Sequence, residues 1–158
     1  MKTAVYPGSF DPETNGHLDV LQRGLKIFDR IIIGVGEHSD KKYLFPADER
    51  VALLQGVTKG LPVAVKHFRG LLVDFAKKEG ACAILRGLRA VSDFDAEFQQ
   101  ALMNRKLDKD IETVFIMTRG MYSYLRSSIV KEVAHLGGKL NGMVPEIVEK
   151  KLREKFKQ

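Results

Sequence analysis

Short apolar runs alternate with amphipathic stretches along the chain, and this alternation limits the possible folds more than any other feature. Residues 30–35 form the clearest run, Arg-Ile-Ile-Ile-Gly-Val, whose β-branched side chains are typical of a strand buried on both faces. Strands that alternate with helices form parallel sheets, because each helical crossover returns the chain to the same edge. The sequence therefore predicts a Rossmann-like α/β fold with a doubly wound, five-stranded parallel sheet, helices on both faces and further helices at the C-terminus.

The boundaries of the expected elements follow from the spacing of the apolar residues. Strands are expected at residues 3–6, 30–35, 63–65, 83–85 and 114–117. Helices are expected at residues 18–28, 48–57, 71–78, 93–105, 127–136 and 145–156. Neither a linker nor an internal repeat interrupts this order, so residues 1–158 are expected to form one domain.

The composition excludes several classes of protein. Hydrophobic residues make up 44% of the chain, too many for disorder, yet no apolar run approaches the roughly 20 residues that span a bilayer. Pro7 and Gly8 end the first apolar run too early for a signal peptide, so a cytoplasmic protein without membrane association is expected. Cys82 is the single cysteine, which excludes an internal disulfide, and its apolar neighbours predict a buried thiol in a strand.

The chain carries a formal net charge of +6, which suits nucleic acid, an anionic surface or a polyanionic small molecule. Many of the cations recur in the loops that follow the expected strands, namely Lys41, Lys42, Arg69, Arg86, Arg89, Arg119 and Arg126. This distribution is typical of a lined pocket, and the sequence lacks RNA-module aromatics, zinc-finger spacing and a basic heptad region. We therefore expect a pocket that binds anions and no nucleic-acid partner.

Residues 6–17, with the sequence YPGSFDPETNGH, form a loop between the first strand and the first helix. His17 falls in the first turn of that helix, where free N–H groups and the helix dipole favour an anion. Loops at the carboxyl ends of parallel strands converge, so this loop should meet residues 41–42, 86–89 and 122–128. A phosphate site with one histidine and a plain turn with a surface histidine fit these twelve residues equally well.

Several familiar motifs are missing from the sequence. It contains neither the Gly-x-x-x-x-Gly-Lys-Ser/Thr loop nor the Gly-x-Gly-x-x-Gly fingerprint of nucleotide-binding proteins. It also lacks a Gly-x-Ser-x-Gly elbow and a Cys/His cluster, so no metal site made by the protein is expected.

Four stretches together carry a resemblance to a known family. They are residues 6–12 (YPGSFDP), 14–17 (TNGH), 86–94 (RGLRAVSDF) and 127–132 (SSIVKE). Residues 14–17 look like the T/H-x-G-H motif of the nucleotidyltransferase superfamily, in its threonine variant. In this order and at this chain length, the four stretches resemble bacterial phosphopantetheine adenylyltransferases over essentially the whole chain, so residues 1–158 would be a single nucleotidyltransferase domain.

The resemblance implies transfer of the adenylyl group of ATP to 4′-phosphopantetheine, which gives dephospho-coenzyme A and pyrophosphate. This is the penultimate step of coenzyme A biosynthesis, and the family uses Mg²⁺ carried by ATP. The acceptor phosphate attacks the α-phosphorus in line, so the enzyme needs positioning and electrostatic stabilisation but no covalent intermediate. The family also implies a homohexamer, a dimer of trimers, with coenzyme A as a candidate feedback inhibitor.

The resemblance also implies roles for individual residues. His17 would stabilise the transition state, and Lys41 and Arg89 would be the other catalytic residues. The residues implied to bind ATP are Ser9, Phe10, His17, Gly87, Leu88, Arg89, Glu97, Tyr122, Ser123, Tyr124, Leu125, Arg126, Ser127 and Ser128. Those implied to bind the acceptor are Ser9, Lys41, Leu72 and Arg86. The chain departs from many members of the family at Arg126, where they have serine, and at Ala96, where they have tyrosine.

Each assignment has a plainer alternative. The arginines of residues 86–89 can pair with the carboxylates of residues 93–97 as ordinary loop residues. Ser127 and Ser128 can cap a helix, and Leu72 can belong to the core. Three rival functions also remain at this point: a nicotinamide-nucleotide adenylyltransferase, a cytidylyltransferase, and a non-catalytic module that binds nucleotide or RNA.

Overall fold

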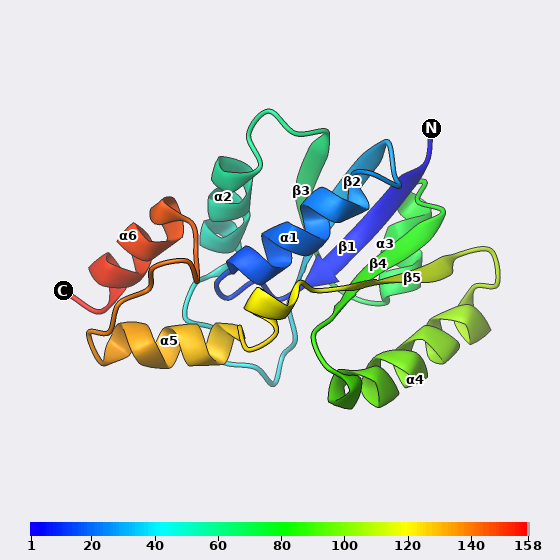
Figure 1. Ribbon diagram of the computed structural model, residues 1–158. Helices are drawn as coiled ribbons and strands as arrows, with labels where there is room; N and C mark the ends of the chain where they lie inside the picture. Colours follow the sequence, from blue (N-terminus) through cyan, green and yellow to red (C-terminus); the bar gives the residue numbers. More distant parts are fainter. Residues whose placement is uncertain (158) are drawn as a thin grey trace.

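A computed structural model, which describes residues 1–157, contains one five-stranded sheet with strand order β3-β2-β1-β4-β5 (Figure 1). The strands are β1 (Thr3–Gly8), β2 (Arg30–Gly36), β3 (Val63–Phe68), β4 (Ala83–Leu88) and β5 (Glu112–Met117). All four neighbouring pairs are parallel. The chain therefore winds outward from β1 in both directions, which confirms the predicted doubly wound α/β fold.

Helices connect the strands and complete the chain. They are α1 (Asn15–Gly24), α2 (Ala47–Val57), α3 (Leu72–Lys78), α4 (Val91–Leu107), α5 (Ser127–His135) and α6 (Glu146–Lys155), with a 3₁₀ turn η1 (Gly120–Tyr122). The sequence analysis expects each of the α-helices, although not η1. α1 begins three residues before its predicted start, because the Thr14 side chain accepts the His17 main-chain N–H and caps the first turn.

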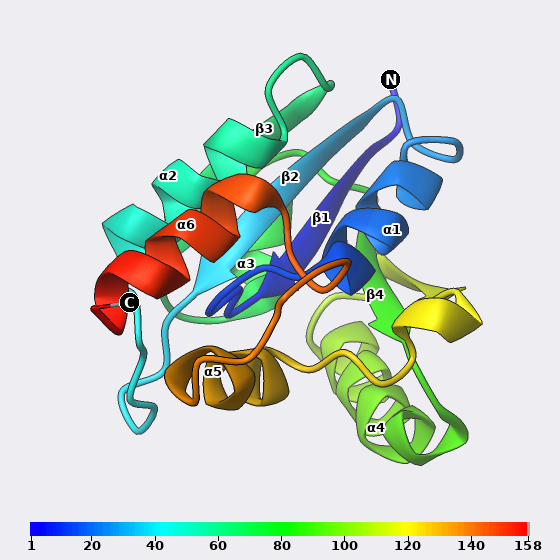
Figure 2. The ribbon, with the colours of Figure 1, turned by 60° about the vertical axis from the view of Figure 1, so that its left-hand side comes forward.

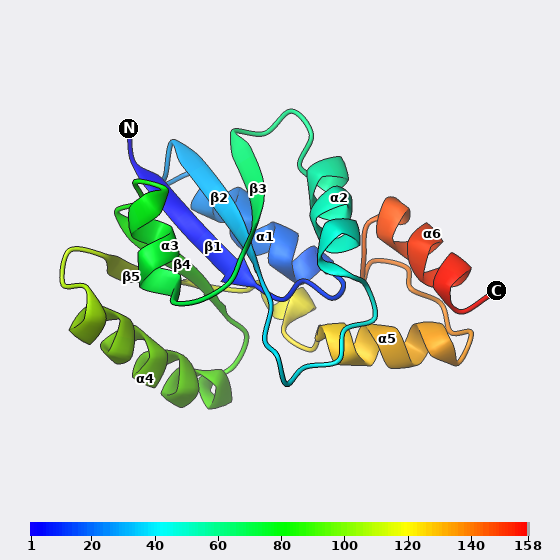
Figure 3. The ribbon, with the colours of Figure 1, turned by 180° about the vertical axis from the view of Figure 1, so that it is seen from behind.

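Two apolar layers cover the two faces of the sheet. α1 and α2 lie on one face, where Leu21 and Leu54 join the layer that contains Ile33 of β2. α3 lies on the opposite face, where Val73 joins the layer that contains Ile32 (Figure 3). The adjacent residues Ile32 and Ile33 belong to different layers because successive strand side chains point to opposite faces.

A third apolar cluster joins the two C-terminal helices to the rest of the molecule. α6 lies beside α2, and α5 lies below them at the carboxyl end of the sheet (Figure 2). Val130 of α5 and Val148 of α6 are fully buried in this cluster together with Phe45 and Leu125. Phe45 and Leu125 end two loops that reach the carboxyl edge of the sheet, so the C-terminal helices brace those loops.

Cys82 differs from its prediction. It is exposed, whereas Ala81 and Ala83 on either side of it are buried. Cys82 lies one residue before β4, where its thiol donates to the Thr3 carbonyl oxygen at 3.4 Å. The prediction of a buried thiol is therefore wrong: the apolar neighbours do fill the core, but the cysteine side chain faces away from it.

α4 is the one α-helix of residues 1–157 without a buried residue. Its apolar side chains are exposed, with Phe94 at 42%, Phe98 at 46% and Leu102 at 53% of their full surface. Phe94 and Phe98 stack with ring centroids 5.4 Å apart. The predicted helix is thus present, but it is barely amphipathic, because Met103 and Leu107 are exposed as well. A single copy of the chain leaves the side of Phe94, Phe98 and Leu102 uncovered. No helix within residues 1–157 is both long and apolar enough to cross a membrane.

Candidate active site

A cavity of about 260 Å³ opens at the carboxyl ends of β1 and β4. The strand order reverses between these two strands, and open α/β sheets bind their ligands at such a switch point. Three segments form most of the wall: the loop after β1, the loop after β4 and the segment before α5. Their lining residues include Ser9, Thr14, Gly16, His17, Arg86, Gly87, Arg89, Leu125, Arg126 and Ser127. The predicted convergence of these loops is confirmed.

A second cavity, of about 870 Å³, adjoins the first. The two cavities share Pro7, Gly8, Ser9, Arg86 and Glu97. The second cavity extends past Lys41 in the loop after β2, past Leu72 at the start of α3, and along one side of α4. Ser9 and Arg86 therefore lie in a wall that is common to both cavities, and we call this the shared wall.

His17 is held by the residue that caps its helix. The main-chain N–H of Thr14 donates to Nδ1 of His17 at 3.0 Å, and the Thr14 hydroxyl accepts the His17 main-chain N–H at 3.4 Å. Because a main-chain N–H can only donate, Nδ1 must be an unprotonated acceptor. A neutral His17 ring therefore carries its proton on Nε2, which makes Nε2–H a hydrogen-bond donor.

The surroundings of His17 keep its ring neutral. Burial, reinforced by the positive charges of Arg89 and Arg86, lowers the pKa of His17 to about 4. The Phe10 ring packs edge-on against the imidazole, with centroids 5.1 Å apart. Gly8 permits this packing, because a Cβ atom at Gly8 would lie 2.9 Å from the Phe10 ring. The loop thus presents a fixed, uncharged donor at the wall of the first cavity.

Both arginines of the loop after β4 pair with carboxylates of α4. Arg86 contacts Glu97 through Nε at 2.7 Å and Nη2 at 2.5 Å, and Arg89 contacts Asp93 at 3.2 Å. Arg86 also donates to the Pro7 carbonyl oxygen at 3.1 Å, which ties it to β1. These are the pairs of the plainer interpretation, yet both guanidinium groups still line the first cavity. The carboxylates therefore fix two cations at the site.

The segment before α5 divides into residues that reach the first cavity and residues that do not. Leu125, Arg126 and Ser127 line it, whereas Leu88 and the rest of residues 122–128 do not line either cavity. Ser127 donates its hydroxyl to the Pro12 carbonyl oxygen at 2.7 Å. It does not cap α5, whose N-cap is Arg126 without a side-chain hydrogen bond. Ser127 thus joins this segment to the loop after β1.

Lys41 and Leu72 lie away from His17, in the second cavity. Lys41 lines that cavity, whereas its neighbour Lys42 is not among the described residues that line either cavity. Leu72 both packs against the apolar layer around α3 and lines the second cavity. Leu72 therefore belongs both to the core and to the lining of the second cavity.

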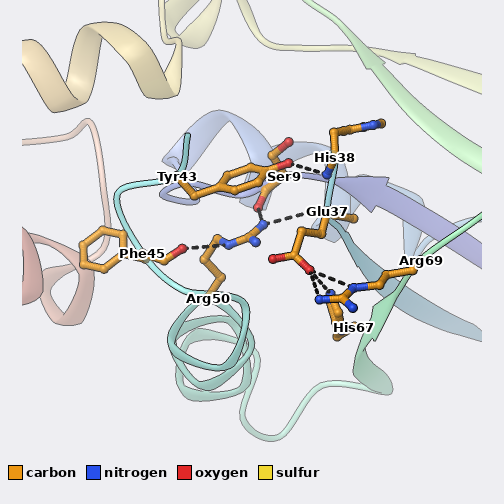
Figure 4. A network of polar contacts seen from close by, with 9 residues as sticks. Ser9, Glu37, His38, Tyr43, Phe45, Arg50, His67 and Arg69 are labelled. Carbon is orange, nitrogen blue, oxygen red and sulfur yellow. Dashed lines mark hydrogen bonds and ion pairs between the residues drawn. The ribbon is translucent and has the colours of Figure 1, made fainter. Parts of the chain in front are cut away.

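Two buried charged residues beside the site are absent from the sequence-based assignments. The Asp11 carboxylate accepts the main-chain N–H groups of Leu44 and Phe45, both at 2.9 Å, and pairs with Lys131 at 3.0 Å. Arg50 of α2 is fully buried and donates to main-chain carbonyl groups (Figure 4). Asp11 lies in the quoted stretch 6–12, but nothing in the sequence marks its carboxylate or the Arg50 guanidinium as buried, because a lone charge in a loop or on a helix is usually exposed.

The amino-acid sequence matches a family model and is similar to known enzymes. Residues 5–133 match the model of the cytidylyltransferase-like family. A phosphopantetheine adenylyltransferase of Clostridium botulinum (strain Eklund 17B / Type B) is 60% identical over 97% of this chain and 98% of its own length. The enzyme of that name from Moorella thermoacetica is 56% identical over 99% of this chain and 98% of its own length.

Solved structures share the fold at low sequence identity. A Vibrio parahaemolyticus protein assigned as a nicotinate-nucleotide adenylyltransferase superposes with a TM-score of 0.68 at 16% identity, covering 99% of this chain and 95% of its own. A lipopolysaccharide core biosynthesis protein of Thermoplasma volcanium GSS1 gives a TM-score of 0.57 at 21% identity, covering 75% of this chain and 98% of its own.

A switch-point cavity with a histidine at a helix start, in a chain that matches this family model, defines an enzyme of the nucleotidyltransferase class. The sequence relatives narrow the class further, since they share one name and are 53% to 61% identical to the chain over nearly its full length. The chain belongs to the phosphopantetheine adenylyltransferase family, which confirms the resemblance found in the sequence.

Proposed function

We propose that this enzyme transfers the adenylyl group of ATP to 4′-phosphopantetheine, forming dephospho-coenzyme A and releasing pyrophosphate. The observation that carries the proposal is the shared wall between the two cavities. The first cavity offers His17 and arginines to the phosphates of ATP. The second offers Lys41 to the acceptor phosphate and a larger volume to the pantetheine arm. The two reacting phosphates would then meet beside Ser9 and Arg86.

The reaction exchanges one phosphorus–oxygen bond for another. An oxygen of the acceptor phosphate attacks the α-phosphorus of ATP, and the bond to the oxygen that bridges the α- and β-phosphates breaks. Pyrophosphate leaves with the electron pair of the broken bond. The attacking oxygen is already anionic, so no general base is needed, which fits a site without one.

The residues of the first cavity would stabilise the charge that develops during this exchange. Nε2–H of His17 donates to a non-bridging oxygen of the α-phosphate, and the main-chain N–H of Gly16, which lines the same cavity in the first turn of α1, would add to it. Arg89, near the segment before α5, would neutralise the leaving pyrophosphate, and Arg86 would hold the acceptor phosphate from the shared wall. Ser9 would contribute its hydroxyl between the two phosphates.

We propose that Mg²⁺ enters on the phosphates of ATP. Apart from Glu97, the charged residues that line the first cavity are cationic, and Glu97 is already paired with Arg86. Mg²⁺ prefers oxygen ligands, with carboxylates and substrate phosphates foremost among them. The donor set therefore fits an ion carried by the substrate and does not fit one held by the protein. When bound, the ion supplies charge neutralisation on the phosphates.

Turnover with different acceptors tests the proposed reaction. We expect pyrophosphate release from ATP and Mg²⁺ with 4′-phosphopantetheine, and none with nicotinate mononucleotide or without an acceptor. Pyrophosphate release with nicotinate mononucleotide alone would instead support the rival adenylyltransferase. Salt-sensitive RNA binding without any turnover would support the non-catalytic rival.

We also propose a homohexamer, a dimer of trimers, that acts in the cytoplasm. The exposed apolar face of α4 supports self-association, because a second copy would cover it. Coenzyme A combines the pantetheine arm with an adenine nucleotide, so it could occupy parts of both cavities. We therefore propose coenzyme A as a feedback inhibitor that competes with both substrates.

A further inference from the structure

Arg50 is a buried cation that no step of the proposed reaction uses. Its side chain is 0% exposed, and its hydrogen bonds within residues 1–157 all go to main-chain carbonyl oxygens. Its Nη2 atom has no hydrogen-bond partner among the described residues. Burying a guanidinium group in this way costs free energy, so packing alone does not explain why an arginine stands at this position.

The three carbonyl groups that Arg50 contacts come from three separate segments. Nη1 donates to Ser9 at 2.7 Å and to Gly36 at 3.1 Å, and Nε donates to Phe45 at 3.1 Å. The Tyr43 ring covers the guanidinium group, with its centroid 4.1 Å from Cζ. Figure 4 shows this arrangement, in which one planar group joins the loop after β1, the end of β2 and the end of the loop before α2.

These contacts fix the relative position of two parts of the proposed site. Ser9 lies in the shared wall, and Gly36 and Phe45 are the two ends of the loop that carries Lys41. Tyr43 helps to shape the same loop, because its hydroxyl accepts the His38 main-chain N–H at 2.9 Å. A lysine at position 50 could not reproduce the fork, since an ammonium group has one nitrogen where a guanidinium group has three.

We infer that Arg50 is a positioning residue of the reaction: it sets the loop that carries Lys41 against Ser9, and thereby the acceptor phosphate against the α-phosphate of ATP. This inference rests on the proposed function. It predicts a larger effect on the acceptor than on ATP, because the loop at residues 37–44 lines only the second cavity.

The test compares Arg50→Lys with Arg153→Lys in the full chain. Arg153 also donates to a main-chain carbonyl oxygen, that of Gly138 at 2.7 Å, but it lies in α6 away from both cavities. For Arg50→Lys we expect kcat/KM for 4′-phosphopantetheine to fall by about 10- to 100-fold, while the Kd for ATP changes less than about threefold. Arg153→Lys should leave both values unchanged, whatever it does to the melting temperature.

Two further variants keep the inference testable if Arg50→Lys fails to fold. Tyr43→Leu removes the half-buried ring that covers the guanidinium group, and should lower kcat/KM for the acceptor in the same direction. In a Lys41→Ala background the same change should have a much smaller effect, because both act through one loop. If Tyr43→Leu and Arg50→Lys lower only the melting temperature, as a structural arginine would, the inference is wrong. Absence of turnover in the unaltered enzyme would instead refute the proposed function.

Discussion

His17 shows how a main-chain contact can select the chemistry of a side chain. The Thr14 N–H occupies Nδ1, and the low pKa of about 4 removes the second ring proton at neutral pH. The ring is therefore a donor through Nε2 without being a cation. Such a donor stabilises a phosphoryl oxygen most in the transition state, when negative charge on that oxygen is greatest.

His17→Ala is expected to lower kcat by about 100- to 1,000-fold, the usual effect of removing one preorganised donor. The Kd for ATP should change less than about threefold, because many other groups hold the nucleotide. Stopped-flow pyrophosphate release and equilibrium titration with ATP measure the two quantities separately. His17→Gln, which retains an N–H donor, should recover part of the rate. A collapse of ATP affinity with kcat unchanged would contradict the role in the transition state.

Glu13 is a second residue whose behaviour depends on its surroundings. It is 0% exposed, and neither carboxylate oxygen has a hydrogen-bond partner among the described residues. Burial raises the pKa of Glu13 to about 7. The folded state thus holds a proton between pH 4.5 and 7 that the unfolded chain releases. The contribution of Glu13 to stability is therefore greatest below pH 4.5 and is lost as the pH rises through 7.

Glu13→Gln should remove this pH dependence, because a carboxamide is neutral at every pH. We expect the free energy of unfolding of the variant, relative to the unaltered protein, to increase by about 3 kcal/mol between pH 4.5 and pH 8. Urea titrations of both proteins at the two pH values measure the change. A difference between the two proteins that is the same at both pH values would show that the carboxyl group is not protonated in the fold.

At the scale of the elements, α1 packs on the sheet at a point where any side chain larger than that of glycine would force its neighbours to move. A Cβ atom at Gly24 would lie 2.6 Å from Leu85 Cδ2 and 2.9 Å from Ile31 Cδ1. These atoms belong to β4 and β2, so the glycine sets how closely the helix approaches two strands at once. The position lies at the last residue of α1, away from the cavities.

Gly24→Ala is expected to lower the free energy of unfolding by about 1–3 kcal/mol, despite the better helix propensity of alanine, because overpacking forces the neighbours to move. Adding Leu85→Val to Gly24→Ala removes one of the two contacts and should cost less than the sum of the two single changes. Gly120→Ala is a matched control, since no atom lies within 4 Å of its Cβ position. Equal losses in the two glycine variants would contradict the packing argument.

The sequence predicts the positions of the strands and α-helices well, but it predicts poorly which individual polar side chains are buried. Apolar periodicity locates every strand and α-helix, because burial of whole faces dominates element formation. The start of α1 shifts because the side-chain cap at Thr14 extends the helix by one turn. Arg50 and Cys82 depend instead on which direction a single side chain points. That direction is settled by packing between elements distant in the sequence, which periodicity does not contain.

The candidate site shows the same division. The loops converge because of the topology of the sheet, so the sequence alone places His17, Arg86 and Arg89 close together. The sequence also predicts, as the plainer alternative, the pairing of both arginines with carboxylates of α4. It does not predict the shared wall, because that wall depends on the shapes of several loops at once. The roles of these residues in binding and catalysis stay predictions.

At the scale of the whole molecule, α4 leaves apolar side chains uncovered. Phe94 and Phe98 stack on one another, and the ring centroid of Phe94 lies 6.4 Å from that of Phe115 in β5, so aromatic rings cluster on this face. An exposed apolar patch of this kind is typical of an interface. The same helix lines the second cavity with other residues, so the proposed interface and the proposed acceptor pocket lie on one helix.

Phe98→Glu should shift the protein toward smaller species, because it places a charge in the centre of the proposed interface. Sedimentation velocity over a range of concentrations measures the distribution of species. Gln99→Glu adds the same charge at the next, exposed residue and serves as the control. A hexamer that survives Phe98→Glu as well as it survives Gln99→Glu would show that the interface lies elsewhere.

The shared wall has a consequence for the design of inhibitors. Ser9 and Arg86 line both cavities, so one tethered molecule that spans the shared wall would contact the two at once. Such a molecule loses its translational and rotational freedom once, whereas two separate fragments each lose theirs. Joining a weak nucleotide fragment to a weak pantetheine fragment across this wall should therefore gain more affinity than enlarging either fragment alone.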